Sequence, residues 1–389
     1  MEGGMEISLN KIKEDDIIKI LFAENPGIVI QVKDKHKEEV KKILEDAGIG
    51  YVKLGKPTEE RHILVEKGDA TYQFGIDYLR DVWYSTSYLL DRKQSMNGCA
   101  KKRFENYKKQ PLEFVFDKSF TGKLSQFGLN PDRRTPTGIK AAIIREKGTN
   151  GEREMAYMLY LAGFDVKDVT MTDLVSGRET LEDINFIVFC GGFSNSDVLG
   201  SAKGWAGAFL FNPKAKAALD NFYARKDTLS LGVCNGCQLM IELNLINPDF
   251  TKKAKMLHND SHKFESKFVG VTVPMNRSVM FGSLSGSKLG IWVAHGEGKF
   301  SLPYHEDKYN VVLKYSYDEY PGNPNGSDYS VAGLASPDGR HLAMMPHLER
   351  SCFPWQNAYY PADRIKNDQI TPWMEAFVNA RKWIEMNKK

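Results

Sequence analysis

The sequence is poor in cysteine and has no long hydrophobic run. Five cysteines among 389 residues are an odd number and too few for a disulfide framework, so free thiols are expected. Met1–Lys13 lacks the basic start and the apolar core of a secretory signal peptide. No apolar stretch reaches the length needed to cross a bilayer. These absences predict a cytoplasmic protein without a membrane partner, whose thiols are available for chemistry.

Charge of one sign is scarce as well. The formal net charge is +3, and lysine-rich stretches such as Lys33–Lys42 also contain acidic residues. Nucleic-acid binding normally needs a concentrated basic surface, so no nucleic-acid partner is expected. With 42% hydrophobic and 26% charged residues, the composition is typical of a globular protein. A length of 389 residues exceeds one comfortable hydrophobic core, which favours two domains.

Residues 1–98 predict a small α+β domain, and residues 99–138 predict a linker. Gly27–Val32 (GIVIQV) is a short, nearly apolar run and is therefore expected to be a buried strand. The other expected elements are helices at Lys35–Ala47 and Val82–Asp91 and strands at Tyr51–Leu54, Arg61–Glu66 and Thr71–Phe74. Residues 99–138 hold basic clusters and prolines with few periodic apolar positions, which is typical of an irregular connection.

Residues 139–389 predict an α/β domain. Apolar strands alternate with helices, which favours a mostly parallel, doubly wound sheet that binds ligands beyond the carboxyl ends of its strands. The expected strands are Ala141–Ile144, a strand ending at Val169, Phe186–Cys190 and Leu229–Val233, with helices at Glu152–Ala162, Ala215–Tyr223 and Gly236–Leu245. Further, partly antiparallel strands are expected at Lys267–Pro274, Leu289–Ala294, Asn310–Tyr315, Val331–Ala335 and Leu342–Met345.

The most informative stretch places a cysteine between a strand and a helix. The strand Leu229–Val233 ends directly before Cys234, and Gly232 and Gly236 flank the cysteine as in a nucleophile elbow. Glycines are needed there because the turn is strained and crowds its neighbours. The thiol should project beyond the sheet edge, and the start of the following helix should favour its thiolate form. Cys234 is therefore the candidate nucleophile.

Other interpretations of this cysteine stay open. With Cys237 it forms a Cys-x-x-Cys pair, which is half of a zinc site, but no second pair stands at usable spacing and no metal site is expected. A thioredoxin-like dithiol does not require the flanking glycines or Gln238. A buried cysteine that only packs is the third alternative.

A thiolate nucleophile needs a base, an orienting acid and oxyanion donors. His347 and Glu349 follow a strand that Pro346 breaks, so the carboxylate can orient the imidazole while the imidazole faces the thiol. Oxyanion donors are expected from the backbone of Gly191 and Gly192, at the end of the Phe186–Cys190 strand, and from the Asn235 amide next to the nucleophile. His295 and Gly296 also follow an apolar strand and are candidates to contact the substrate, although a tight turn with a satisfied histidine explains them equally well.

Four motifs together resemble a known family. GVCNGCQLM, CGGFSNSDVLG, AHGEGKF and MMPHLER are similar to the glutaminase domain of the phosphoribosylformylglycinamidine (FGAM) synthase family, the large single-chain type. The resemblance extends from about Lys140 through PWMEAFVNARKWI. It implies a class I, flavodoxin-like glutaminase with Cys234, His347 and Glu349 as catalytic triad. It also implies L-glutamine as substrate and a contact from Gln238 to that glutamine.

The first part of the chain resembles the same family. LFAENPGIVIQV and LRDVWYSTSYLLDR are similar to the end of the synthetase region, which implies ATP and Mg²⁺ in a synthetase portion outside this sequence and no cofactor within it. The expected partner is that portion, joined covalently or supplied in trans. The sequence departs from the family at Leu348, where many members have proline, and at Asn195-Ser196, where Tyr-Gly is more familiar. Another cysteine-elbow hydrolase and a redox-sensitive regulatory module are the remaining alternatives.

Overall fold

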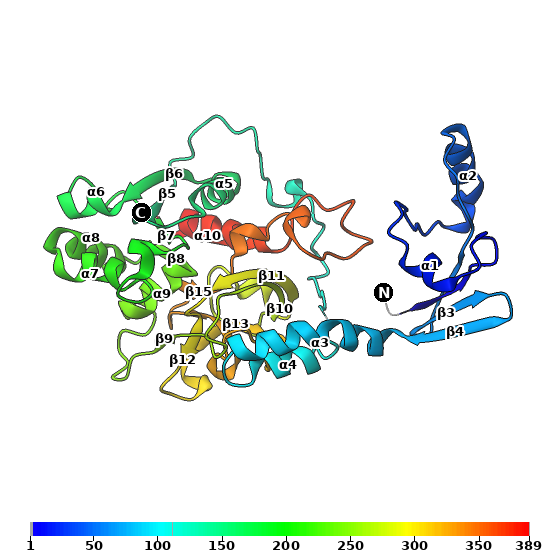
Figure 1. The fold of residues 1–389 in the computed structure, drawn as a ribbon. Coiled ribbons are helices and arrows are strands. Elements are labelled where there is room, and N and C mark those ends of the chain that lie inside the picture. The colour runs from blue at the N-terminus through cyan, green and yellow to red at the C-terminus, as the bar shows by residue number, and fades with distance from the viewer. Residues whose placement is uncertain (1–2, 111, 389) are drawn as a thin grey trace. The chain divides into compact units, whose positions relative to one another are not determined.

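The computed structural model describes residues 3–110 and 112–388, and the chain divides into two compact units, Met1–Leu90 and Asp91–Lys389 (Figure 1). Helix α3 (Ile76–Gln94) begins in the first unit and ends in the second. The expected linker, residues 99–138, belongs to the second unit and is helical at its start, where α4 (Cys99–Glu105) forms. No helix among the described residues is long and apolar enough to span a membrane.

The first unit contains a four-stranded sheet with the order β2-β1-β3-β4. Its strands are β1 (Gly4–Ser8), β2 (Gly55–Thr58), β3 (His62–Lys67) and β4 (Ala70–Gly75). β1 pairs in parallel with β3 and antiparallel with β2, and β3 and β4 form a hairpin. The unit also holds helices α1 (Ile17–Phe22) and α2 (Lys37–Asp46).

Two strand predictions in this unit are wrong. Gly27–Val32 has no strand pairing and is exposed except for the half-buried Val32. The strand expected at Tyr51–Leu54 instead forms as β2, immediately after it. The strand β1 was not expected, because only two apolar residues alternate in its five positions. The apolar run Gly27–Val32 has the composition of a buried strand, but the described residues supply no neighbouring strand for it.

The second unit is built on a nine-stranded sheet with the order β11-β10-β13-β14-β15-β8-β7-β5-β6. Five adjacent strands are parallel, namely β15 (His341–Met344), β8 (Leu229–Val233), β7 (Phe186–Phe189), β5 (Lys140–Arg145) and β6 (Asp165–Thr170). Numbered along the chain, they run 2-1-3-4-5 from β6 to β15, which is the flavodoxin-like order. The predicted α/β, flavodoxin-like fold is confirmed.

Helices cover both faces of the parallel strands. α5 (Glu152–Ala162) contacts α10 (Trp373–Asn387), and a second connected group contains α6 (Met171–Ser176), α7 (Lys203–Phe211), α8 (Pro213–Ala224) and α9 (Asn235–Glu242). Right-handed crossovers place α5 and the group α6–α9 on opposite faces, because the crossovers change direction along the sheet after β6. The strands lie between the two groups (Figure 1), and Phe186, Phe189 and Trp205 are fully buried there.

The remaining strands of this sheet are antiparallel, as expected from the sequence. They are β10 (Glu265–Thr272), β11 (Lys288–His295), β13 (Asn310–Tyr315) and β14 (Val331–Ala335). A separate ribbon pairs β9 (Lys255–Leu257) with β12 (Lys299–Ser301). These strands extend the sheet beyond β15, so the loops after β8, β11 and β15 can meet at one site.

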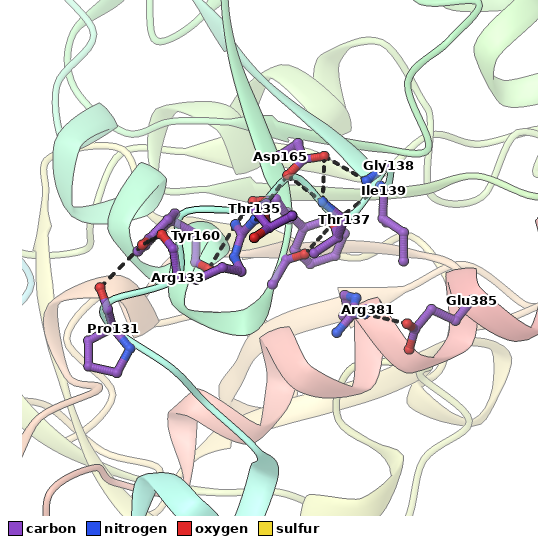
Figure 2. Close-up of polar contacts among 12 residues, drawn as sticks. Pro131, Arg133, Thr135, Thr137, Gly138, Ile139, Tyr160, Asp165, Arg381 and Glu385 are labelled. Carbon is purple, nitrogen blue, oxygen red and sulfur yellow. Dashed lines mark hydrogen bonds and ion pairs between the residues drawn. The ribbon is translucent and has the colours of Figure 1, made fainter.

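The end of the expected linker is tied to the amino end of β6. Asp165 accepts hydrogen bonds from the backbone of Thr137 and Gly138 and pairs with Arg133, and the guanidinium of Arg133 also lies 4.7 Å from the Tyr160 ring centre (Figure 2). A pocket of about 510 Å³ adjoins this cluster, and none of the candidate site residues lines it. Ligands of such sheets bind at the carboxyl ends of the strands, so we infer that this pocket results from packing and is not the ligand site.

Candidate active site

Cys234 occupies a strained turn between β8 and α9. Its backbone has φ +53° and ψ −107°, which side chains with a Cβ rarely adopt, and its N–H donates to the carbonyl oxygen of Met344 at 3.0 Å. Cys234 is 5% exposed, and its thiol donates to the carbonyl oxygen of Ala294 at 3.5 Å. The predicted elbow is therefore present, and it directs the sulfur toward the loop after β11.

The two glycines of the elbow are required by close approach. A Cβ on Gly232 would lie 2.5 Å from the carbonyl oxygen of Gly236, and a Cβ on Gly236 would lie 2.0 Å from the carbonyl oxygen of Phe189 in β7. No side chain fits at either position without movement of backbone. The start of α9 is thus pressed against two neighbouring strands, which fixes the position of Cys234.

His347 lies beside the thiol because β8 and β15 are parallel and adjacent. Val233 and Met344 are register partners, so both strands end at the same edge of the sheet. The His347 N–H donates to the carbonyl oxygen of Trp292 at 2.9 Å, which anchors the loop, and the His347 ring is a hydrogen-bond partner of Cys234. The structure brings the predicted nucleophile and base together.

Glu349 holds the other side of the imidazole. Its Oε1 is 2.7 Å from Nδ1 of His347, and both residues are almost fully buried. Burial alone would lower the pKa of His347, but the Glu349 charge and the hydrogen bonds to Cys234 and Glu349 raise that pKa to about 10. His347 therefore keeps its proton at neutral pH, next to the sulfur. The contribution of the protonated His347 ring to the free energy of unfolding is fully present below pH 6.5 and is lost as the pH rises to about 10.

Replacing Glu349 by glutamine should move the alkaline limit of catalysis by the Cys234–His347 pair to lower pH. Glutamine keeps an oxygen acceptor for His347 but removes the charge that raises the pKa, so the protonated imidazole is lost about one to three pH units earlier. The pH dependence of kcat measures this shift. Glu154→Gln is the control, because Glu154 pairs with Arg350, as Glu349 also does, but lies at the surface. An unmoved limit in Glu349→Gln would show that another group sets it.

The predicted oxyanion donors surround the same point. A Cβ on Gly191 would lie 2.8 Å from Cε1 of His347 and 3.3 Å from Cβ of Cys234, so only glycine allows this contact. Gly192 has φ +115°, a conformation that favours glycine. The N–H groups of Gly191, Gly192 and Asn235 have no acceptor among the residues that the structure describes. They remain available to a substrate oxygen, and their role stays a prediction.

The Asn235 and Gln238 side chains form a buried bridge behind the nucleophile. Nδ2 of Asn235 donates to Oε1 of Gln238 at 2.9 Å, and Nε2 of Gln238 donates to the carbonyl oxygen of Glu297 at 2.8 Å. Oδ1 of Asn235 accepts from the N–H of Ser194 at 3.0 Å. This bridge ties the turns after β7 and β11 to α9. The predicted contact from Gln238 to glutamine stays a prediction, while the observed contacts of its side chain organise the site.

Two carboxylates beside this bridge were not predicted. Oδ1 of Asp197 accepts from Nδ2 of Asn235 at 3.3 Å, and Ser201 donates to both Asp197, through its hydroxyl, and Glu297, through its N–H. Burial first, and then the nearby Glu297 charge, raise the pKa of Asp197. Both acids stand in the quoted motifs, Asp197 in CGGFSNSDVLG and Glu297 in AHGEGKF. Their proximity depends on the packing of segments about 100 residues apart, which the sequence pattern does not reveal.

His295 is buried next to the catalytic pair without a hydrogen-bond partner for its ring. It is 2% exposed, and neither ring nitrogen has a partner among the described residues. Burial, together with repulsion from His347, lowers the pKa of His295 to about 3, so the ring is neutral. The neighbouring Gly296 accepts from the N–H of Asn259 at 2.9 Å through its carbonyl oxygen. The substrate contacts expected of His295 and Gly296 stay predictions.

The two departures from the family motifs have different structural consequences. Leu348 is fully buried in the core, so it replaces proline by an apolar side chain that packs. Asn195, Ser196 and Asp197 have consecutive positive φ values of 52°, 56° and 48°. Glycine would adopt the conformation of Ser196 without strain, so its serine costs about 1 kcal/mol or more in this turn.

Comparison with known proteins shows the family to which the chain belongs. The profile of a family described as a CobB/CobQ-like glutamine amidotransferase domain matches residues 138–384. The chain belongs to the CobB/CobQ-like glutamine amidotransferase family. The elbow of the amidotransferase and its His347–Glu349 pair both lie inside the matched region, and the two alternative functions are not favoured.

The curated relatives of the amidotransferase are much longer proteins. Human phosphoribosylformylglycinamidine synthase is 38% identical over 98% of this chain and 30% of its own length. The probable chloroplastic/mitochondrial phosphoribosylformylglycinamidine synthase of Arabidopsis thaliana is 37% identical over 95% of this chain and 27% of its own length. A chain of the PurLQS structure from Thermotoga maritima is 27% identical with a TM-score of 0.48, over 64% of this chain and 99% of that one. The amidotransferase thus spans less than a third of the two curated relatives.

Proposed function

We propose that this amidotransferase hydrolyses L-glutamine to glutamate and ammonia, and that the ammonia serves an FGAM synthase reaction in purine biosynthesis. The observation that carries the proposal is the contact of Cys234, at its strained turn, with the ring of His347 and with the backbone of Gly191. Oε1 of Glu349 lies 2.7 Å from Nδ1 on the other side of the His347 ring. The names of the relatives support the synthase reaction, in which formylglycinamide ribonucleotide becomes formylglycinamidine ribonucleotide with ATP. ATP and Mg²⁺ belong to the synthetase portion in this proposal.

The mechanism follows from the protonated state of His347. The Cys234 thiolate attacks the carboxamide carbon of glutamine, and the developing oxyanion is held by the free N–H groups of Gly191, Gly192 and Asn235. His347 transfers its proton to the amide nitrogen as the C–N bond breaks and ammonia leaves. His347 then takes a proton from water, and the resulting hydroxide attacks the glutamyl thioester. This step gives glutamate and restores the thiolate–imidazolium pair.

Recognition of the rest of the glutamine molecule fits the acidic pair. Glutamine carries an α-ammonium group, and Asp197 and Glu297 are half-buried carboxylates that both accept hydrogen bonds from Ser201. Asp197 also accepts from Asn235, the residue after Cys234. A cation between them relieves the repulsion that contributes to the raised pKa of Asp197. We therefore assign Asp197 and Glu297 to the α-ammonium group, with Gln238 keeping the Glu297 turn in place.

Hydrolysis of two substrates tests this proposal. L-glutamine and its analogue without the α-amino group are given to the chain, alone and with the human relative shortened to remove the region that matches this chain. Glutamine should release ammonia, and kcat/KM for the analogue should be about 10- to 150-fold lower, the value of one hydrogen bond to a charged group. No ammonia from glutamine in either arm would contradict the glutaminase assignment. Equal use of both substrates would remove the acidic pair from it.

Cellular location is a separate matter. The cytoplasmic location expected from the sequence stays a prediction, because the Arabidopsis thaliana relative is named for the chloroplast and the mitochondrion.

A further inference from the structure

The turn that begins at the end of β11, residues 295–298, accepts a hydrogen bond at each of its four carbonyl oxygens. Three of the donors are side-chain amides, and one is a backbone N–H. In chain order the donors are Nδ2 of Asn259, the N–H of Asn259, Nε2 of Gln238 and Nδ2 of Asn325, at 2.7, 2.9, 2.8 and 2.7 Å. Because backbone groups of an irregular turn lack the ladder of a sheet, these amides decide the path of its main chain.

Two of these donor residues come from separate segments and lock together. Asn259 follows β9, and Asn325 lies between β13 and β14; both are fully buried. Asn259 also accepts from the N–H of Gly298 through Oδ1 at 3.0 Å, so it contacts both ends of the turn. The N–H of Asp260 donates to the carbonyl oxygen of Asn325 at 3.1 Å, which joins the two segments. We call Asn259 and Asn325 the amide clamp.

The orientation of the Asn325 amide shows that its donor is what the position requires. Nδ2 donates to the carbonyl oxygen of Gly298 and to the hydroxyl of Tyr315, at 2.7 and 3.0 Å. A carbonyl oxygen can only accept, so the nitrogen must face Gly298. Oδ1 of Asn325 is then buried without a partner among the described residues, which costs free energy. The fold accepts this cost and keeps the hydrogen bond to the turn.

We propose that Asn259 and Asn325 are positioning residues for glutamine recognition, which place the Glu297 carboxylate by clamping the backbone of its turn. The proposal rests on the assignment of Glu297 to the α-ammonium group of glutamine in the proposed function. Cys234 and His347 follow other strands, β8 and β15, and are not part of the turn. A displaced turn should therefore weaken the binding of glutamine more than it slows the chemical step.

Asn325→Asp in the full chain, with the shortened human relative present, tests the proposal. Ionised aspartate has nearly the same shape but turns an acceptor toward the Gly298 carbonyl oxygen. KM for L-glutamine should rise about 10-fold or more, while kcat stays within about 3-fold. The analogue without the α-amino group has no ammonium for Glu297, so its kcat/KM should stay within about 3-fold. Asn259→Ala should give the same pattern, and it carries the test if Asn325→Asp does not fold.

Asn310→Asp is the matched control. Asn310 is also a buried asparagine of the second unit, and its Nδ2 donates to the carbonyl oxygen of Ser336 at 3.1 Å, away from the turn. Urea unfolding should show a loss of stability in this variant as in Asn325→Asp. Its KM for L-glutamine should stay within about 2-fold, which separates a loss of stability from a loss of position.

The outcomes that overturn the proposal differ from those that overturn the proposed function. Reduced stability with an unchanged KM in both Asn325→Asp and Asn259→Ala would leave the amide clamp a purely structural role. An equal loss with glutamine and with the analogue would show that its effect does not pass through Glu297. Equal use of the two substrates by the unchanged chain would reject the Glu297 assignment and the clamp with it. No ammonia from the unchanged chain would reject the glutaminase itself.

Discussion

Cys234→Ala is expected to reduce glutamine hydrolysis by about 10⁴-fold or more. Removing a covalent nucleophile abolishes the intermediate, and the residual rate then comes only from substrate binding and oxyanion stabilisation. The backbone at Cys234 keeps its φ of +53° with alanine, and the thiol's one backbone hydrogen bond, to Ala294, is weak at 3.5 Å. The free energy of unfolding should therefore change by only about 1 kcal/mol. Glutamate formation and covalent labelling by a glutamine-analogue electrophile measure the loss.

Cys237→Ala is the matched control for that experiment. Cys237 lies three residues further on in α9 and is fully buried, so its thiol does not reach the substrate side. The variant should keep its activity within a few-fold and still be labelled once, with a stability loss of about 1 kcal/mol for the small cavity. Full activity in Cys234→Ala would show that another residue is the nucleophile. Loss of labelling in Cys237→Ala, with labelling kept in Cys234→Ala, would show the same.

The catalytic residues were predictable because their signals are local. Cys234 and His347 each follow a strand of the parallel sheet, and such strands end at one edge, so residues far apart in sequence meet there. Glu349 is two positions from His347 and needs no long-range information. By contrast, Asp197 and Glu297 meet only through the packing of two separate turns on α9. Nothing in the spacing of their motifs encodes that distance.

The fold was predictable to a similar extent and for the same reason. Alternating apolar strands and helices indicate the parallel strands of the second unit one by one, whereas the order 2-1-3-4-5 was implied by the family resemblance and not by the pattern. In the first unit, the apolar pattern predicted a buried strand at Gly27–Val32, where the structure has neither a strand nor a buried residue. It gave the wrong outcome because burial also needs a partner surface, and a partner surface is not a property of the run itself.

Gly236→Ala is expected to lower the free energy of unfolding of the second unit by about 3 kcal/mol or more. The new Cβ would lie 2.0 Å from the carbonyl oxygen and 2.6 Å from the carbonyl carbon of Phe189, which is fully buried in β7. Backbone of a central strand cannot rotate aside as a side chain can, so α9 or β7 must shift. The shift also displaces Cys234, and its labelling should fall together with stability.

Gly207→Ala separates this steric effect from the general effect of adding a methyl group. Gly207 lies within α7, where a Cβ would meet only the Phe211 ring at 3.8 Å, an ordinary contact. Alanine forms helix more readily than glycine, so this variant should be more stable by about 0.5–1 kcal/mol, opposite in sign to Gly236→Ala. Urea unfolding followed by tryptophan fluorescence reports on the second unit, because five of the six tryptophans lie there. Equal stability of the two variants would show that the start of α9 is not held against β7, and the elbow would then lose the rigidity on which the mechanism depends.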